Sequence, residues 1–293
     1  MVVAQLLDRT VIAKFACFKD NPVVAIERLN AGLSQECYRV QTTKGEFLAK
    51  RFKSVASYEK ELAITKQKVL TQVIPQLNAY RENWLISEYL QGSMLSEVEM
   101  SFEDKLRVVL PLAKKFYSIA SNIETSSPLF KDICLPDLIK DMASALGNDV
   151  NREQLINDVL QAYQSDSDKS GYEPVLCHGD LNFNNIMYHH SLEDWRLFDF
   201  ESCHYSTVEY DLAMLLAVNE YPITKFDSLL NIFIKHFPKV SLDLVTRNYL
   251  MCLLINALWY ESESIKGRDR TVRNKYKALS DKQQSLLNQA LYR

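Results

Sequence analysis

The chain has 293 residues, of which 47% are hydrophobic, so it can bury a sizeable core in one large or two modest domains. Charged residues interrupt the first sixteen positions, and this excludes a signal peptide or a membrane span there. The six cysteines include no Cys-x-x-Cys pair, so we expect reduced thiols in a cytoplasmic protein rather than a disulfide framework.

The N-terminal third predicts a small antiparallel sheet with one helix. Its pattern favours strands at 23–29, 37–42 and 46–52, a helix at 57–70, and further strands at 76–80 and 84–89. The loop between the first two strands, NAGLSQE, contains a single glycine, Gly32. Leu90 to Ser93 break the strand pattern, and this region of the chain should end there.

Lys50 occupies an unusual position for a lysine. Strand alternation places it on one face with Leu48 and Phe52, where a charged side chain requires an explanation. The following helix offers Glu59 and Glu61. The alternative is a lysine that extends from a strand edge into solvent.

From residue 102 onward the apolar residues recur with helical spacing. The pattern predicts helices near 103–122, 135–146, 152–164, 208–219, 223–236, 241–260 and 270–292. The apolar run from Leu250 to Trp259 is only ten residues long and contains Asn256, so it predicts a buried helix and no membrane anchor. The polar stretch at 164–174 is a connector.

The most informative stretch is VLCHGDLNFNNIMYHHSLEDWRLFDFE at 175–201. Short apolar runs flank a polar loop, and the stretch carries His178, Asp180, Asn185, Asp199 and Glu201. Phosphoryl transfer needs a base that orients a hydroxyl, oxygen ligands for magnesium and a cation on the phosphates. The residue types suit that chemistry, whereas the bland alternative is a polar turn that joins two core strands.

Charge is unevenly distributed around this stretch. The net charge is −3, yet nine acids and a single arginine fall between Ser170 and Thr224. This segment therefore carries −8 and the remainder +5. We expect an acidic cleft that attracts magnesium and a cationic substrate and does not bind nucleic acid, the alternative being a solvated acidic face.

The spacing His-x-Asp-Leu-x-x-x-Asn, followed by Asp-Phe-Glu, resembles the catalytic block of the aminoglycoside phosphotransferase and choline kinase superfamily. The resemblance is strong at 175–213 and looser at 29–92 and 250–263. It implies an α+β, two-lobed protein-kinase-like fold. Residues 1–91 would form a small nucleotide-binding lobe with an antiparallel sheet and one helix, and residues 92–293 a larger, mainly helical lobe with the catalytic loop and the substrate site.

The resemblance also implies a role for each candidate residue. Asp180 would be the catalytic base with His178 beside it, and Asn185 and Asp199 would bind magnesium. For His178 a structural role, bonded to the loop backbone, is the favoured alternative. The implied ATP-binding residues are Lys50 paired with Glu61, Gly32, and the hinge residues Glu88, Tyr89 and Leu90. The substrate candidates are Glu201, Asp211, Trp259 and Tyr260. Helix capping is an equal explanation for Asp211, and core packing for the aromatic pair.

These roles imply an ATP-dependent kinase that phosphorylates the hydroxyl of a small, cationic alcohol such as choline, ethanolamine or thiamine. Its partners would be that alcohol, ATP and magnesium, without nucleic acid or a membrane. An aminoglycoside-type phosphotransferase, a non-catalytic nucleotide-binding protein and a metal hydrolase that uses His178 and Asp180 are the alternatives. The sequence offers the hydrolase no second pair of ligands at recognisable spacing.

Overall fold

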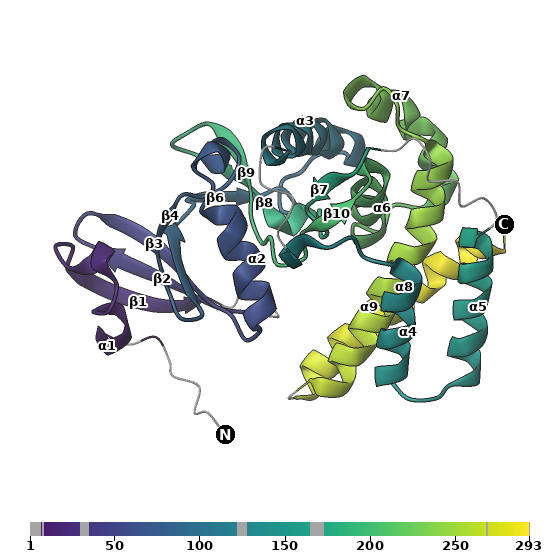
Figure 1. Ribbon diagram of the computed structural model, residues 1–293, viewed down its shortest axis with the longest axis horizontal. Coiled ribbons are helices and arrows are strands. Elements are labelled where there is room, and N and C mark those ends of the chain that lie inside the picture. The colour runs from purple at the N-terminus through teal and green to yellow at the C-terminus, as the bar shows by residue number, and fades with distance from the viewer. Residues whose placement is uncertain are drawn as a thin grey trace. The chain divides into compact units, whose positions relative to one another are not determined.

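The computed structural model describes residues 7, 9–29, 35–121, 128–164, 173–267 and 269–292, and it has the predicted α+β class (Figure 1). The chain divides into two compact units. The first runs to Val98 and includes the end of one helix from Ser118 and the segment Asn184–Ser202. The second contains Glu99–Tyr117 and most of the remaining chain.

A five-stranded antiparallel sheet forms the centre of the first unit, in the order β1-β2-β3-β5-β4. The strands are β1 (Val23–Leu29), β2 (Glu36–Thr42), β3 (Gly45–Arg51), β4 (Leu77–Arg81) and β5 (Trp84–Glu88). The tight β2–β3 turn ends at Gly45, whose φ of 149° is accessible to glycine. The predicted meander is confirmed.

Helix α2 (Val55–Thr65) follows this meander and starts at Ser54, whose side chain accepts a hydrogen bond from the amide of Ser57. The predicted helix extended to residue 70. Instead, extended Gln67 interrupts it, and a separate 3-10 turn, η2 (Lys68–Gln72), follows. This break lets Leu70 turn into the core, where it is fully buried.

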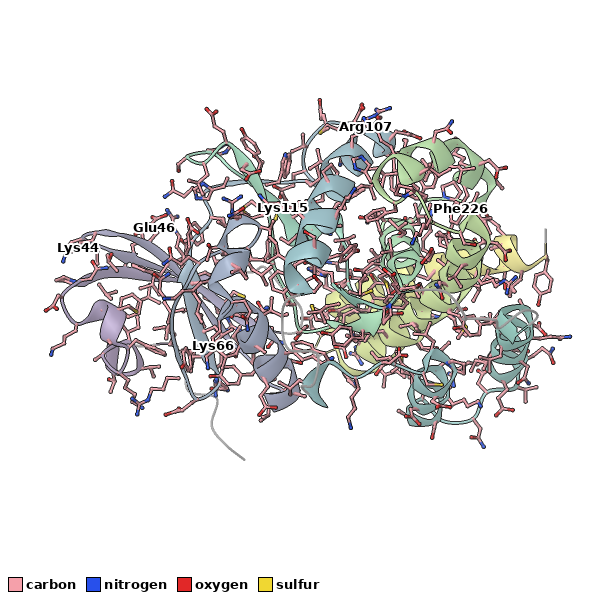
Figure 2. The ribbon with its side chains drawn as sticks, turned by 45° about the horizontal axis from the view of Figure 1, so that its top comes forward. Lys44, Glu46, Lys66, Arg107, Lys115 and Phe226 are labelled. Carbon is pink, nitrogen blue, oxygen red and sulfur yellow. The ribbon has the colours of Figure 1, made fainter. Side chains whose placement is uncertain are left out.

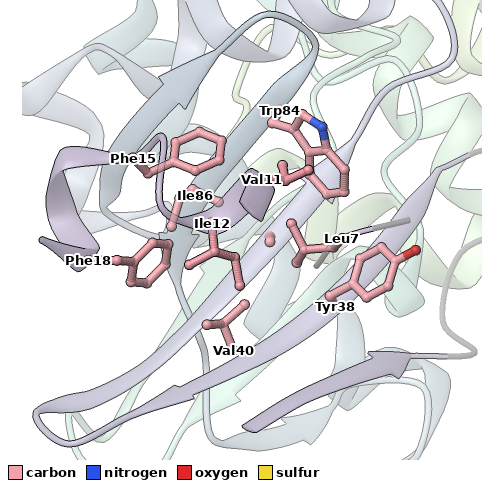
Figure 3. Close-up of a cluster of buried hydrophobic side chains, with 10 residues drawn as sticks. Leu7, Val11, Ile12, Phe15, Phe18, Tyr38, Val40, Trp84 and Ile86 are labelled. Carbon is pink, nitrogen blue, oxygen red and sulfur yellow. The ribbon is translucent and has the colours of Figure 1, made fainter. Parts of the chain in front are cut away.

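The N-terminal residues provide one layer of the first unit's core. Short helices α1 (Arg9–Ile12) and η1 (Ala16–Phe18) bring apolar side chains against the sheet (Figure 3). Val11, Ile12 and Phe15 pack there with Trp84 and Val40. The apolar character of this segment therefore serves packing.

A second small sheet belongs to the first unit, with the order β6-β8-β9. It joins β6 (Gly92–Met94) to the hairpin of β8 (Ile186–His189) and β9 (Asp194–Leu197). The expectation that residues 90–93 are irregular is wrong, because Gly92 starts a strand. A Cβ atom at Gly92 would lie 1.6 Å from the carbonyl oxygen of Tyr188, so only glycine permits this close pairing.

The second unit is mainly helical. Its helices are α3 (Phe102–Ala120, whose last turn falls in the first unit), α4 (Leu135–Ala145), α5 (Val150–Gln164), α6 (Val208–Val218), α7 (Phe226–His236), α8 (Leu242–Lys266) and α9 (Arg270–Leu291). The 3-10 turns η3 (Pro128–Phe130) and η5 (Ile223–Lys225) lie in the same unit, and η4 (Phe183–Asn185) begins in it. Strands β7 (Val175–Cys177) and β10 (His204–Ser206) pair antiparallel.

Helix α8 is the central element of this unit. It packs against α6 and lies along α9 (Figure 1). Its middle, from Val245 to Leu258, is largely buried, as predicted for the apolar run. In the part of the chain that the structure describes, no helix combines the length and apolar composition needed to cross a membrane.

Candidate active site

The first unit holds a buried cluster of one lysine and two carboxylates. Lys50 lies on β3 and is 9% exposed. Its Nζ atom is 2.6 Å from Asp199 Oδ1 and 3.4 Å from Glu61 Oε1, so the predicted pair with Glu61 is present. The backbone amide of Phe200 donates to Glu61 Oε2 at 2.5 Å. Glu61 therefore holds both the lysine and the chain segment that carries Asp199.

The electrostatics of this cluster favour a charged lysine. Burial opposes the charge of Lys50, but the carboxylates of Glu61 and Asp199 outweigh burial and raise its pKa above the ordinary value. Burial also raises the pKa of Glu61 above its ordinary value, against the opposing effect of Lys50. The lysine is therefore a fixed cation, which suits a role on nucleotide phosphates.

Glu201 belongs to the same cluster. The side-chain amide of Gln35 donates a hydrogen bond to Glu201 Oε2 and accepts one from the amide of Lys53 at 3.3 Å. Glu201 therefore lies with the candidate nucleotide residues of the first unit, and its role on the acceptor side stays a prediction. Sequence reasoning missed this contact, because Gln35 and Glu201 are 166 positions apart in the chain.

Asn185 lies immediately before β8, and Asp199 lies two residues after the end of β9. The Asn185 carbonyl accepts a hydrogen bond from the Phe198 amide at 3.1 Å, which places the two chain segments side by side. Asp199 has a φ of 72°, a strained conformation for a residue other than glycine and one that is typical of functional sites.

The donor set of this region suits magnesium. Within the described residues no three His, Cys, Asp or Glu side chains gather into a metal-binding cluster. Magnesium needs no such cage, because it is commonly bound through one or two protein oxygen ligands, substrate phosphates and water. A carboxylate from Asp199 and an amide oxygen from Asn185 fit that mode.

The second unit holds the loop with the candidate base. The buried carboxylate of Asp211, on α6, accepts hydrogen bonds from the amides of His178 at 2.7 Å and Gly179 at 2.9 Å. The hydroxyl of Tyr117, on α3, donates to the same carboxylate at 2.8 Å. Asp211 therefore fixes the backbone that leads into Asp180, while its substrate role stays a prediction.

His178 is completely buried. Its ring lies against Phe116, with a centroid distance of 6.4 Å, and its Nδ1 atom accepts a hydrogen bond from the backbone amide of Asp180 at 3.4 Å. This geometry favours the structural role over direct acid–base work. Sequence reasoning missed Tyr117, because a tyrosine on the apolar face of a helix carries no signal that distinguishes it from a core residue.

An aromatic cluster joins α8 to α9. The Trp259 ring lies 5.2 Å from the Tyr260 ring and 5.8 Å from Tyr276, which sequence reasoning also missed. Trp259 is 38% exposed, so the cluster reaches the surface. Burial raises the pKa of Tyr260 to about 12, with smaller contributions from the negative charges of Asp180 and Glu220.

The predicted hinge residues follow β5. Glu88 ends the strand, its Oε1 atom lies 3.5 Å from His189 Nε2, and Tyr89 and Leu90 continue beyond it, both partly exposed. The guanidinium of Arg39 stacks over the Tyr89 ring at 5.1 Å. Gly32, the predicted phosphate-loop residue, lies outside the described residues.

The residues at 130–237 match the model of the phosphotransferase enzyme family. A search among curated proteins finds no significant match.

Several solved structures share the fold. Choline kinase LicA from Streptococcus pneumoniae, also solved with AMP, aligns with a TM-score of 0.69 and 18% identity over 92% of this chain and 94% of LicA. A choline/ethanolamine kinase family protein from Mesorhizobium loti gives a TM-score of 0.66 and 16% identity over 97% and 96% of the two chains. Aminoglycoside phosphotransferase APH(4)-Ia gives a TM-score of 0.64 and 12% identity over 91% and 94%. These alignments establish the kinase-like fold.

Proposed function

Since the chain has the fold of the choline kinases and aminoglycoside phosphotransferases, we propose that it is an ATP-dependent kinase that phosphorylates the hydroxyl of a small cationic alcohol. The observation that carries this proposal is the buried contact of Lys50 with both Glu61 and Asp199. A lysine held between two carboxylates stays charged and oriented, as a clamp for nucleotide phosphates requires.

Each side chain then has a distinct task. Asp180 orients the acceptor hydroxyl and takes its proton, while Asp211 holds the loop that carries it. Asn185 and Asp199 hold magnesium, which neutralises phosphate charge when it is bound. Lys50 contacts the phosphates, and the segment after Glu88 receives the adenine base.

The aromatic cluster is the proposed acceptor site. The exposed face of Trp259, beside Tyr260 and Tyr276, can attract a quaternary or primary ammonium group by about 0.5–2 kcal/mol. Choline, ethanolamine and thiamine combine such a cation with a hydroxyl. An aminoglycoside is the second candidate, because it is also cationic and the fold is shared with an aminoglycoside phosphotransferase.

Release of ADP with a panel of alcohols tests the proposal. The panel contains choline, ethanolamine, thiamine, an aminoglycoside and the carbon analogue of choline in which a tert-butyl group replaces trimethylammonium. One cationic alcohol should exceed the neutral analogue roughly tenfold in kcat/KM, and release should require magnesium. Equal use of the neutral analogue would contradict cation selection. Calorimetric binding of ATP without any substrate-stimulated release would instead indicate a non-catalytic protein.

A variant locates the acceptor site. Trp259→Leu should raise KM for the cationic alcohol severalfold and leave KM for ATP unchanged, because the tryptophan would lie on the acceptor side. Trp195→Leu, a matched loss of a partly buried indole on β9, should change neither constant. An unchanged alcohol KM in Trp259→Leu would remove the aromatic cluster from the proposal.

A further inference from the structure

The segment Glu88–Gly92 connects β5 to β6 and contains the proposed adenine-binding residues. Two of its side chains contact the β2–β3 hairpin. The Tyr89 ring lies under the guanidinium of Arg39 at 5.1 Å, and the side-chain amide of Gln91 donates to Glu46 Oε2 at 2.8 Å. The segment is therefore attached to the sheet through side chains as well as through its backbone.

Both contacts depend on one carboxylate. Glu46 lies on β3 and is labelled in Figure 2. Its carboxylate accepts hydrogen bonds from Arg39 Nη2 at 2.5 Å and Nε at 3.2 Å, and from the side-chain amide of Gln41 at 3.0 Å. Its side chain is only 17% exposed and that of Arg39 30%, so neither is a freely solvated surface charge. The hydrogen bond from Arg39 lowers the pKa of Glu46, which remains ionised at neutral pH.

The backbone of the segment is held at its ends. The amide of Glu88 donates to the carbonyl of Gln76 at 2.8 Å, and the carbonyl of Gln91 accepts from His190 at 3.1 Å. Gly92 then lies against Tyr188. Glu46 adds a restraint between these ends, because it holds the arginine that covers Tyr89 and binds Gln91 directly.

We propose that Glu46 is a positioning residue for the nucleotide base. Its carboxylate holds Arg39 on Tyr89 and also binds Gln91, so that Glu88–Gly92 keeps one conformation before a nucleotide arrives. This inference rests on the proposed kinase function. A segment that is already ordered does not lose side-chain freedom on binding, so loss of the restraint should weaken base binding roughly threefold to tenfold.

Calorimetry separates base binding from phosphate binding. Glu46→Gln should weaken binding of ATP and adenosine by that factor, while binding of magnesium tripolyphosphate, which has no base, stays unchanged. KM for ATP should rise with little change in kcat or in KM for the alcohol. The preference for ATP over GTP should narrow as well. A merely structural role would instead weaken all three ligands together.

Glu27→Gln is the matched control. Glu27 Oε2 lies 3.8 Å from the same arginine, but its side chain is 65% exposed and belongs to β1. This variant should bind adenosine as the wild type does. Gln91→Met removes the amide that binds Glu46 and leaves the carboxylate in place, and Gln91 is exposed, so this variant also provides a test if Glu46→Gln fails to fold. It should weaken adenosine binding at least twofold.

The outcomes distinguish the two proposals. Three results would overturn the role of Glu46. The first is unchanged adenosine binding in Gln91→Met and in folded Glu46→Gln. The others are an equal loss of adenosine affinity in Glu27→Gln and a parallel loss of tripolyphosphate affinity in Glu46→Gln. A wild-type protein that binds neither ATP nor adenosine would overturn the proposed function instead.

Discussion

Asp211 uses its buried carboxylate to fix two consecutive backbone amides, and Tyr117 supplies a third hydrogen bond. Tyr117→Phe leaves the ring and removes only the donor. Because a hydrogen bond to a buried charge contributes about 1.5–3 kcal/mol, unfolding in urea should show a loss of that size. Turnover should fall with KM for ATP unchanged, since the loop that carries Asp180 loosens.

A second tyrosine provides the control for that variant. The hydroxyl of Tyr292 also donates to a carboxylate, Asp158 Oδ2 at 2.7 Å, but Tyr292 is 70% exposed. Tyr292→Phe should change neither stability nor turnover measurably. Equal losses of stability and turnover in both variants would show that the buried hydrogen bond to Asp211 contributes no more than the exposed one to Asp158.

Asp180→Asn tests the base directly. The change preserves size, so the fold and ATP binding should persist, while turnover should fall roughly a hundredfold or more, the usual scale for a positioned acid–base group. Steady-state ADP release measures the effect. Glu173→Gln, an exposed acid just before β7, should retain wild-type turnover. Wild-type activity in Asp180→Asn would remove Asp180 from the mechanism.

Cys37 gives the site a pH-dependent signature. Burial raises the pKa of its thiol to about 11, against the opposing influence of Lys50. At pH 8 only roughly one thiol in a thousand is the reactive thiolate, and alkylation should accelerate about a hundredfold by pH 10. Mass spectrometry after iodoacetamide treatment should therefore find exposed Cys134 modified first. Equal alkylation rates for Cys37 and Cys134 at pH 8 would contradict a raised pKa at Cys37.

At the scale of elements, alternation and helical spacing predicted most strands and helices, because each amphipathic pattern matches one buried face. Two errors share a cause. The break at Gln67 and the strand from Gly92 depend on tertiary contacts, with the core around Leu70 and with Tyr188. Neither contact leaves a periodic pattern in the local sequence.

Gly92→Ala tests the close pairing of β6 with β8. A Cβ atom would overlap the Tyr188 carbonyl, so the strands must separate, at a cost of about 1–3 kcal/mol in unfolding free energy. Gly147→Ala is the comparison: its φ of 80° imposes strain, but no atom lies within 4 Å of the added methyl group. Urea denaturation of both variants separates overlap from strain. A smaller loss in Gly92→Ala than in Gly147→Ala would contradict the tight pairing.

For the whole molecule, the motif at 175–201 predicts phosphoryl-transfer residues but carries no signal that they divide between two compact units. His178 and Asp180 belong to the second unit, whereas Asn185, Asp199 and Glu201 belong to the first. The partners Gln35, Tyr117 and Tyr276 come from distant elements, so no local pattern could identify them.

Ion pairs and hydrogen bonds engage several of the acids counted between Ser170 and Thr224. Asp199 pairs with Lys50 and Asp194 with Arg196, while Asp211 binds backbone amides. Because these charges are compensated, raising the salt from 0.05 to 0.3 M should increase KM for the cationic alcohol only about twofold. Initial rates for choline and its neutral carbon analogue measure this effect. An equal increase for the neutral analogue would exclude an electrostatic origin.

The pairing of β6 with β8 also has a consequence for biosynthesis. Gly92 lies opposite His189, so the two partners are separated by nearly a hundred residues. Closing a loop of that length costs roughly 4 kcal/mol of chain entropy. While a ribosome has produced only the first half of the protein, β6 has no partner and its edge is open to other chains. The nascent first unit should therefore depend on chaperones until the hairpin of β8 and β9 emerges.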